Sequence, residues 1–260
     1  MGFLEQFHHS IYGLESSPKL VFLHGLMGFA GNWRRITPAF EKDFQILTYD
    51  QRGHGRSFKP SGGYRPEDYA DDLAKILEEL GWEKIHLVGH SMGGRNAQNF
   101  AARFPQRVVK LVIEDIGPDT SEAAVQKIVD IIERAPTPFT DKVMAKDFFY
   151  NNYKDVSLGA YLYSNIEEKP NKTFDWRFSK EAILESVRLG RAQERWDELK
   201  SLKMPTLLIR GEKSEELPRD VYEKALTVNP LVKGVEIAGS GHWVHFDKPD
   251  EFIQALKKFF

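Results

Sequence analysis

Short apolar runs alternate with longer amphipathic segments along most of the chain, which is the pattern of a parallel sheet covered by helices. Several runs are apolar at successive positions, as is typical of strands buried on both faces. The predicted strands are Lys19–Leu23, Gln45–Tyr49, Ile85–Val88, Val108–Ile113, Thr206–Ile209 and Gly234–Ile237. Apolar residues at helical spacing predict helices at Tyr69–Leu80, Asn96–Phe104 and Glu251–Phe260. We expect an antiparallel start to the sheet within Phe3–Tyr12.

The alternation stops after Pro118, and no strand core is evident between Asp119 and Leu199. This segment is rich in aromatic residues, and its helical stretches are Ala123–Arg134, Lys142–Phe149 and Lys180–Gly190. Most of the aromatics are expected to form the core of a small helical subdomain. A few would face a substrate, as in a lid over an apolar pocket. We therefore predict a core of residues 1–118 and 200–260 with an inserted lid of residues 119–199.

Composition narrows the possible classes of protein. A chain of 260 residues accommodates one α/β domain with an insertion. The formal net charge of −2 provides no general attraction for nucleic acid, and the absence of cysteine excludes disulfides and thiolate metal sites. The amino-terminal stretch does not resemble a signal peptide, and no apolar run is long enough to span a membrane. We expect a cytoplasmic monomer or homodimer.

Ser91 is the candidate nucleophile. It lies in Gly89-His90-Ser91-Met92-Gly93, directly after a predicted strand and before a predicted helix. A sharp strand-to-helix turn needs glycines on both sides to avoid clashes, and it exposes the serine hydroxyl above the sheet. A serine that only caps the helix is the alternative, but the strand and both glycines favour the nucleophile.

A serine nucleophile that attacks a carbonyl needs donors for the developing oxyanion. The Met92 N–H follows the nucleophile directly and is one candidate. The loop His24-Gly25-Leu26-Met27-Gly28 follows an apolar strand, and we expect its Leu26 N–H to be the second donor. His24 is expected mainly to shape this loop. His24, Phe139, Trp176 and Trp243 are the candidate residues for contact with the substrate.

His242 is the candidate general base because it follows a glycine directly after the last predicted strand. Imidazole can take the serine proton and return it to the leaving group near neutral pH. His245 lacks this setting and is expected to pack within its loop. The pair is poor evidence for a metal site because no glutamate stands between the two histidines.

The acid that orients the histidine is less obvious. The loop after Thr206–Ile209 carries Ser214 at the position where a carboxylate is expected, and Glu212, Glu215 and Glu216 are interpreted there as solvated surface residues. Asp115 ends the strand beside the nucleophile and could reach the histidine from there, since ligands bind at the strand ends of an open parallel sheet. Glu114 should point to the opposite face. We predict that Asp115 is the acid and that Ser214 supports it.

Together these motifs resemble the YbfF-type esterases and thioesterases of the α/β-hydrolase superfamily. The matching stretches are HGLMG, YDQRGHGRS, GHSMGGRNAQNFAARFPQRVVKLVIEDIGP, RGEKSEEL and GSGHWVHFDKPDEF. The resemblance implies a mostly parallel eight-stranded sheet with a helical lid after the sixth strand. It also implies nucleophile Ser91, base His242, acid Asp115 and assisting Ser214, with no cofactor and no metal. The implied substrate is a small acyl ester or thioester.

Other functions on the same residues remain open. They include a cofactor-free perhydrolase, a C–C bond hydrolase, a menaquinone-pathway lyase and a ligand receptor that retains the triad. Haloalkane dehalogenases and epoxide hydrolases are disfavoured because they use aspartate where this chain has Ser91. Four arginines could favour an acidic substrate, although such residues are usually solvated or anchor a neighbouring loop. They are Arg95, Arg188, Arg191 and Arg195.

Overall fold

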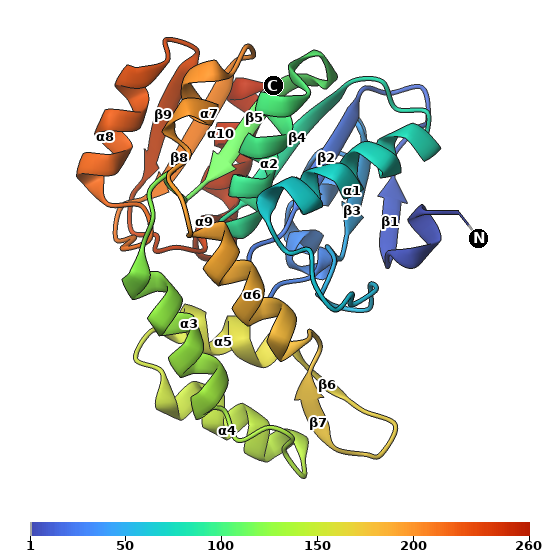
Figure 1. Cartoon of the computed structure of the whole chain (residues 1–260), viewed down its shortest axis with the longest axis vertical. Coiled ribbons are helices and arrows are strands. Elements are labelled where there is room, and N and C mark those ends of the chain that lie inside the picture. The colour runs from blue at the N-terminus through green and yellow to red at the C-terminus, as the bar shows by residue number, and fades with distance from the viewer. Residues whose placement is uncertain (1) are drawn as a thin grey trace.

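The computed structural model describes residues 2–260, and its centre is a seven-stranded sheet of order β1-β3-β2-β4-β5-β8-β9 (Figure 1). The strand β1 (His9–Tyr12) pairs antiparallel with β3 (Gln45–Tyr49), and the remaining neighbours are parallel. The other strands are β2 (Lys19–Leu23), β4 (Ile85–His90), β5 (Val108–Glu114), β8 (Thr206–Gly211) and β9 (Val232–Ile237). All the strands predicted from apolar runs are therefore confirmed.

The predicted count of eight strands is wrong by one. Only β1 precedes β2 within residues 2–260, because Leu4–Gln6 forms a short 3-10 turn (η1) instead of pairing with the sheet. The long insertion consequently follows β5, the fifth strand, and not a sixth.

Alternation along the strands separates two apolar layers. On β2, Val21 and Leu23 join a cluster with α1 (Pro66–Glu79), α2 (Met92–Arg103), α7 (Trp196–Ser201) and α8 (Arg219–Val228). Leu20 and Phe22 face the other side, where they pack with the turns η2 (Ala30–Arg35) and η3 (Thr37–Ala39) and with α10 (Pro249–Phe259). Two short elements complete the core, η4 (Pro105–Arg107) and α9 (Val244–Asp247). Successive residues of a strand point to opposite faces, so this sheet is buried on both.

The segment between β5 and α7 lies beyond one end of the sheet, at the bottom of Figure 1. Its helices are α3 (Glu122–Arg134), α4 (Lys142–Asn152), α5 (Val156–Ser164) and α6 (Lys180–Gly190), each of which begins with a serine or aspartate that caps backbone N–H groups. It also contains a hairpin, β6 (Ile166–Glu168) with β7 (Phe174–Trp176), that the sequence did not predict. Strands of only three residues are too short to show a recognisable alternation.

The aromatic residues of this segment form their own apolar core. Phe139, Phe149 and Trp176 are buried together, and Met27 and Trp243 from loops of the sheet domain join the same cluster. The inserted segment is thereby packed over the carboxyl ends of the strands. No helix within residues 2–260 combines the length and the apolar character that crossing a membrane requires.

Candidate active site

Ser91 occupies a sharp turn between β4 and α2. Its backbone φ of 53° and ψ of −119° lie in a region that residues with a side chain seldom adopt. A Cβ added at Gly89 would lie 2.2 Å from the Gly93 carbonyl oxygen, and one at Gly93 would lie 2.4 Å from the Leu23 carbonyl oxygen. Only glycine fits at these two positions, which explains the spacing of the motif and presents the serine at the edge of the pocket.

His242 lies between Ser91 and Asp115. Its Nε2 is 2.9 Å from Ser91 Oγ, and its Nδ1 is 2.8 Å from Asp115 Oδ2. An ionised carboxylate only accepts hydrogen bonds, so the proton of a neutral imidazole belongs on Nδ1. Nε2 then has a free lone pair directed at the serine hydroxyl. The three residues predicted separately from the sequence are therefore adjacent in space.

Asp115 is fully buried at the end of β5, with a backbone φ of 52°. Its Oδ1 accepts a hydrogen bond from the Gly211 N–H at 2.8 Å, and the Ser214 hydroxyl donates to its Oδ2. Glu114, the preceding residue, turns away from this site and accepts hydrogen bonds from the His245 backbone N–H and ring Nδ1. Asp115 thus receives three donors, from Gly211, Ser214 and His242.

Leu26 and Met92, whose amides are the predicted oxyanion donors, both line the pocket. Met92 is the first residue of α2, so its N–H has no acceptor within the helix. Two hydrogen bonds hold the Gly25 carbonyl, one from His24 Nδ1 at 2.8 Å and one from the Gly28 N–H at 3.0 Å. Because a trans peptide points its N–H opposite to its C=O, these bonds also fix the direction of the Leu26 N–H.

His24 is buried and does not reach the pocket wall. Burial lowers the pKa of His24 to about 4, so its ring is neutral near pH 7. Its Nε2 accepts a hydrogen bond from the Gln51 N–H at 2.9 Å, which leaves the ring proton on Nδ1 for the Gly25 carbonyl. The prediction that His24 contacts substrate is therefore wrong, and the residue shapes the loop.

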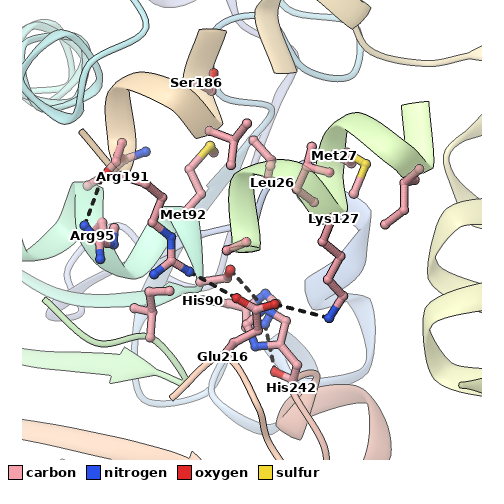
Figure 2. A pocket seen from close by; sticks show the side chains of 18 of the residues that line it. Leu26, Met27, His90, Met92, Arg95, Lys127, Ser186, Arg191, Glu216 and His242 are labelled. Carbon is pink, nitrogen blue, oxygen red and sulfur yellow. Dashed lines mark hydrogen bonds and ion pairs between the residues drawn. The ribbon is translucent and has the colours of Figure 1, made fainter. Parts of the chain in front are cut away.

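The pocket lies between the Ser91 turn, the Leu26 loop, α3 and the end of α6 (Figure 2). Its wall is mainly apolar. Trp243 is part of the wall, but Phe139 and Trp176 are not. Both are buried in the aromatic core of the inserted segment, where Trp176 stacks on Phe178 at 4.8 Å between ring centroids. The prediction that these two aromatics contact substrate is therefore also wrong.

Charged residues form one side of this wall, where Figure 2 shows Arg191, Glu216 and Lys127 converging beside His242. Glu216 Oε2 is 3.1 Å from Arg191 Nη2, and its Oε1 is 3.3 Å from Lys127 Nζ. The interpretation of Glu216 as a solvated surface residue is wrong, because its side chain is only 18% exposed. Burial alone would raise the pKa of Glu216, but the charges of His242, Arg191 and Lys127 outweigh it and lower this pKa.

The other predicted arginines differ in their settings. Arg95 is buried, lines the pocket and donates to the backbone carbonyls of Gly190 and Asp119. Arg195 is buried in ion pairs with Glu67 and Glu198 and does not reach the pocket. Arg188 is exposed on α6 and also lies outside the pocket wall. Proximity in the sequence to a lid helix therefore did not distinguish the arginines that face the site.

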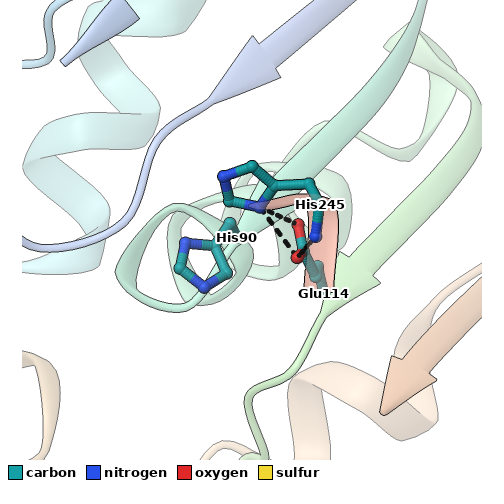
Figure 3. Close-up of side chains that lie close together, drawn as sticks. All are labelled: His90, Glu114 and His245. Atoms are coloured by element: carbon teal, nitrogen blue, oxygen red, sulfur yellow. Dashed lines mark hydrogen bonds and ion pairs between the residues drawn. The ribbon is translucent and has the colours of Figure 1, made fainter. Parts of the chain in front are cut away.

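Three buried residues beneath the Ser91 turn have the composition of a metal site (Figure 3). His90, Glu114 and His245 place potential ligand atoms within 4.8 Å of one another. However, Glu114 already binds His245 at 2.8 Å, and His90 Nε2 lies 3.0 Å from the His242 carbonyl oxygen. Burial, with the nearby His242 and His245, lowers the pKa of His90 well below 6.5. A neutral His90 donating to that carbonyl holds the backbone of His242 in place.

Comparison with known proteins agrees with this architecture. The family model described as alpha/beta hydrolase fold matches residues 18–249. A putative esterase/lipase from Haemophilus influenzae is 30% identical over 253 residues, covering 96% of this chain and 86% of that protein. The sn-1-specific diacylglycerol lipase ABHD11 of Mus musculus is also 30% identical over 253 residues, covering 93% of this chain and 80% of that protein. A solved marine microorganism esterase, 28% identical, superposes with a TM-score of 0.86 over 98% of this chain and 99% of its own.

The chain therefore belongs to the alpha/beta hydrolase fold family. It is a serine hydrolase.

Proposed function

We propose that the protein is a serine esterase or thioesterase that hydrolyses short- to medium-chain acyl esters through an acyl-enzyme on Ser91. The observation that carries this proposal is the position of His242, whose ring lies 2.9 Å from Ser91 Oγ and 2.8 Å from Asp115 Oδ2. The same arrangement of nucleophile, base and acid recurs in hydrolases of unrelated folds. The names of the esterase and lipase relatives support the same reaction class.

In the first half of the reaction, His242 Nε2 takes the hydroxyl proton as Ser91 Oγ attacks the carbonyl carbon of the ester. The carbonyl oxygen becomes an oxyanion, which the Leu26 and Met92 N–H groups stabilise. Asp115 holds the imidazole in the required tautomer and stabilises the imidazolium. The imidazolium then returns the proton to the departing alcohol or thiol, and the acyl group remains on Ser91.

In the second half, a water molecule attacks the acyl carbon while His242 takes a proton from it. A second oxyanion forms in the same place and collapses to the free acid, which regenerates the Ser91 hydroxyl. Every proton is carried by His242, so the proposed reaction involves no cofactor. Ester or thioester cleavage is favoured over amide cleavage because an alcohol or thiol leaves more readily than an amine.

Residues 119–199 act in this proposal as a lid that completes the acyl pocket. The segment contributes Ile128, Ile131, Leu158, Tyr161 and Val187 to the apolar wall, and the sheet domain contributes the rest. An acyl chain that displaces water from such a wall gains about 0.8 kcal/mol for each buried methylene.

The test is hydrolysis of p-nitrophenyl esters from acetate to dodecanoate, with an acyl-CoA series alongside, by wild type and Ser91→Ala. We expect multiple turnover by wild type and loss of at least about 10³-fold in kcat for Ser91→Ala. The preferred acyl chain length then reports how long a chain the pocket accommodates. Absence of turnover by folded wild-type protein across both series would overturn the proposal and favour a narrow lyase or a ligand receptor.

A further inference from the structure

The charges on the pocket wall do not balance. Three cationic side chains, Arg95, Lys127 and Arg191, line the cavity, and Glu216 is the one carboxylate among the lining residues that the structure describes. The remaining wall is mainly apolar, so the charges of Arg95 and Arg191 are poorly screened by water. An excess of positive charge in a low-dielectric cleft attracts an anionic ligand.

Two of the three cations, Arg95 and Arg191, are largely buried, whereas Lys127 is exposed. Side-chain exposure is 11% for Arg191 and 45% for Lys127, and Arg95 as a whole is 4% exposed. Arg95 donates to two backbone carbonyls, and its Nε has no hydrogen-bond partner within residues 2–260. Burial and the neighbouring Arg191 and Arg195 lower the pKa of Arg95 well below 12.5, and the carboxylates of Asp119 and Glu198 offset only part of this effect. The guanidinium groups repel one another, and an added anion would relieve this repulsion.

We propose that Arg191 and Lys127, with Arg95 behind them, form a subsite for a carboxylate carried by the ester or thioester substrate. This inference rests on the proposed esterase function and narrows its substrate class. A carboxylate is favoured because Arg191 and Lys127 already hold one, that of Glu216. Glu216 keeps the two cations in position in the free protein, and the positive excess beyond Glu216 accommodates a second carboxylate.

The subsite adjoins the reacting groups. The Glu216 N–H donates to Ser214 Oγ at 3.2 Å, and Ser214 in turn donates to Asp115. His242 acts on the Glu216 carboxyl group as a nearby charge. A substrate carboxylate bound here would therefore lie beside the imidazole, close to the scissile bond. It could belong to the acyl part or to the leaving group, and the experiment has one arm for each.

Each arm compares an anionic ester with a neutral counterpart. The acyl arm uses mono-p-nitrophenyl adipate and p-nitrophenyl 6-methylheptanoate, in which a branched alkyl end replaces the carboxylate. The leaving-group arm uses 4-acetoxybenzoate and its methyl ester. The measured quantity is the ratio of kcat/KM for the anionic ester to that for the neutral ester. We expect wild type to favour the anionic ester by about tenfold in at least one arm.

Arg191→Met and Lys127→Met should each lower this ratio by about tenfold, chiefly by reducing kcat/KM for the anionic ester. Arg188→Met is the matched control, because Arg188 is exposed on α6 outside the pocket wall, and it should leave the ratio unchanged. Glu216→Gln should raise the ratio, since it removes the competing carboxylate. Substitution of a residue that only stabilised the lid would change kcat/KM equally for the anionic and the neutral ester, so the ratio would stay the same.

A wild-type ratio near one in both arms would overturn the subsite. So would a ratio that neither Arg191→Met nor Lys127→Met alters. In both cases, Ser91-dependent turnover of the neutral esters would leave the proposed esterase function intact. Lys127 is half exposed, so Lys127→Met remains informative even if Arg191→Met does not fold.

Discussion

Ser214 donates its hydroxyl proton to Oδ2 of Asp115, the same carboxylate oxygen that lies 2.8 Å from His242 Nδ1. The loop after β8 therefore contributes a hydroxyl where the sequence pattern led us to look for a carboxylate. The carboxylate comes instead from Asp115 at the end of β5. Because β5 and β8 are neighbouring parallel strands, Asp115 lies beside the loop that follows β8. Gly211, at the end of β8, adds a backbone N–H to the other oxygen of Asp115. The end of β8 and the loop that follows it thus donate hydrogen bonds to the acid, Asp115, but do not supply it.

Asp115→Asn should lower kcat for ester hydrolysis by about 10³- to 10⁴-fold, because an amide cannot hold His242 in the tautomer that accepts the serine proton. The measurement is steady-state hydrolysis of a p-nitrophenyl ester. Glu215→Gln is the control, since Glu215 is an exposed carboxylate on the Ser214 loop, and its kcat should match wild type. Near-wild-type kcat for Asp115→Asn, together with loss in Glu212→Gln or Glu215→Gln, would show that the acid is assigned to the wrong residue.

Ser214→Ala should lower kcat about tenfold with KM nearly unchanged, because it removes one hydrogen bond to the Asp115 carboxylate. Ser214→Thr retains a hydroxyl and should restore most of the lost kcat. The pH dependence of kcat should also shift in Ser214→Ala, since the carboxylate that orients His242 has lost a donor. If kcat and its pH profile both stay at wild-type values, Ser214 has only a packing role.

Gly93→Ala should reduce the free energy of unfolding by roughly 2 to 3 kcal/mol, as overpacking does at a backbone contact. The added Cβ would lie 2.4 Å from the Leu23 carbonyl oxygen and 2.6 Å from that of His24. Gly190→Ala is the matched control at the end of α6, where an added Cβ meets nothing within 4 Å. It should be neutral or stabilise the fold by up to about 1 kcal/mol. Urea unfolding of the three proteins is the measurement, and equal losses would refute the close contact at the turn.

Stability should fall as the pH drops below about 6.5. Burial, with the nearby His24, lowers the pKa of His54 to about 3, whereas an unfolded histidine titrates near 6.5. Between these values the unfolded chain binds a proton that the folded chain does not, so acid favours unfolding by about 1.4 kcal/mol per pH unit for this group. Urea unfolding between pH 7 and 4.5 should show a shallower decline for His54→Gln. The exposed control His8→Gln should keep the wild-type slope, and identical slopes for all three would contradict the prediction.

Local sequence patterns were sufficient to predict the parallel strands and the nucleophile turn, although the predicted number of strands was one too many. Apolar runs such as Lys19–Leu23 and Gln45–Tyr49 coincide with strands because a strand buried on both faces must be largely apolar. Ser91 could be identified because its turn has a local steric requirement, glycine on both sides. His242 could be predicted for a similar reason, since it follows the last strand of the sheet within a short glycine-containing loop. These features depend on neighbours in the chain and leave a local signature.

Which residues face the pocket depends on tertiary packing. Phe139, Trp176 and Trp243 were equivalent as sequence, yet Trp243 lines the cavity and the other two fill the core of the inserted segment. In the sequence, Glu216 could not be distinguished from the exposed carboxylates of the same loop, but the fold places it between Arg191 and Lys127. Side-chain direction in an insertion of several helices depends on how those helices pack on one another and on the sheet. Packing of this kind joins residues distant in the chain, and no local pattern records it.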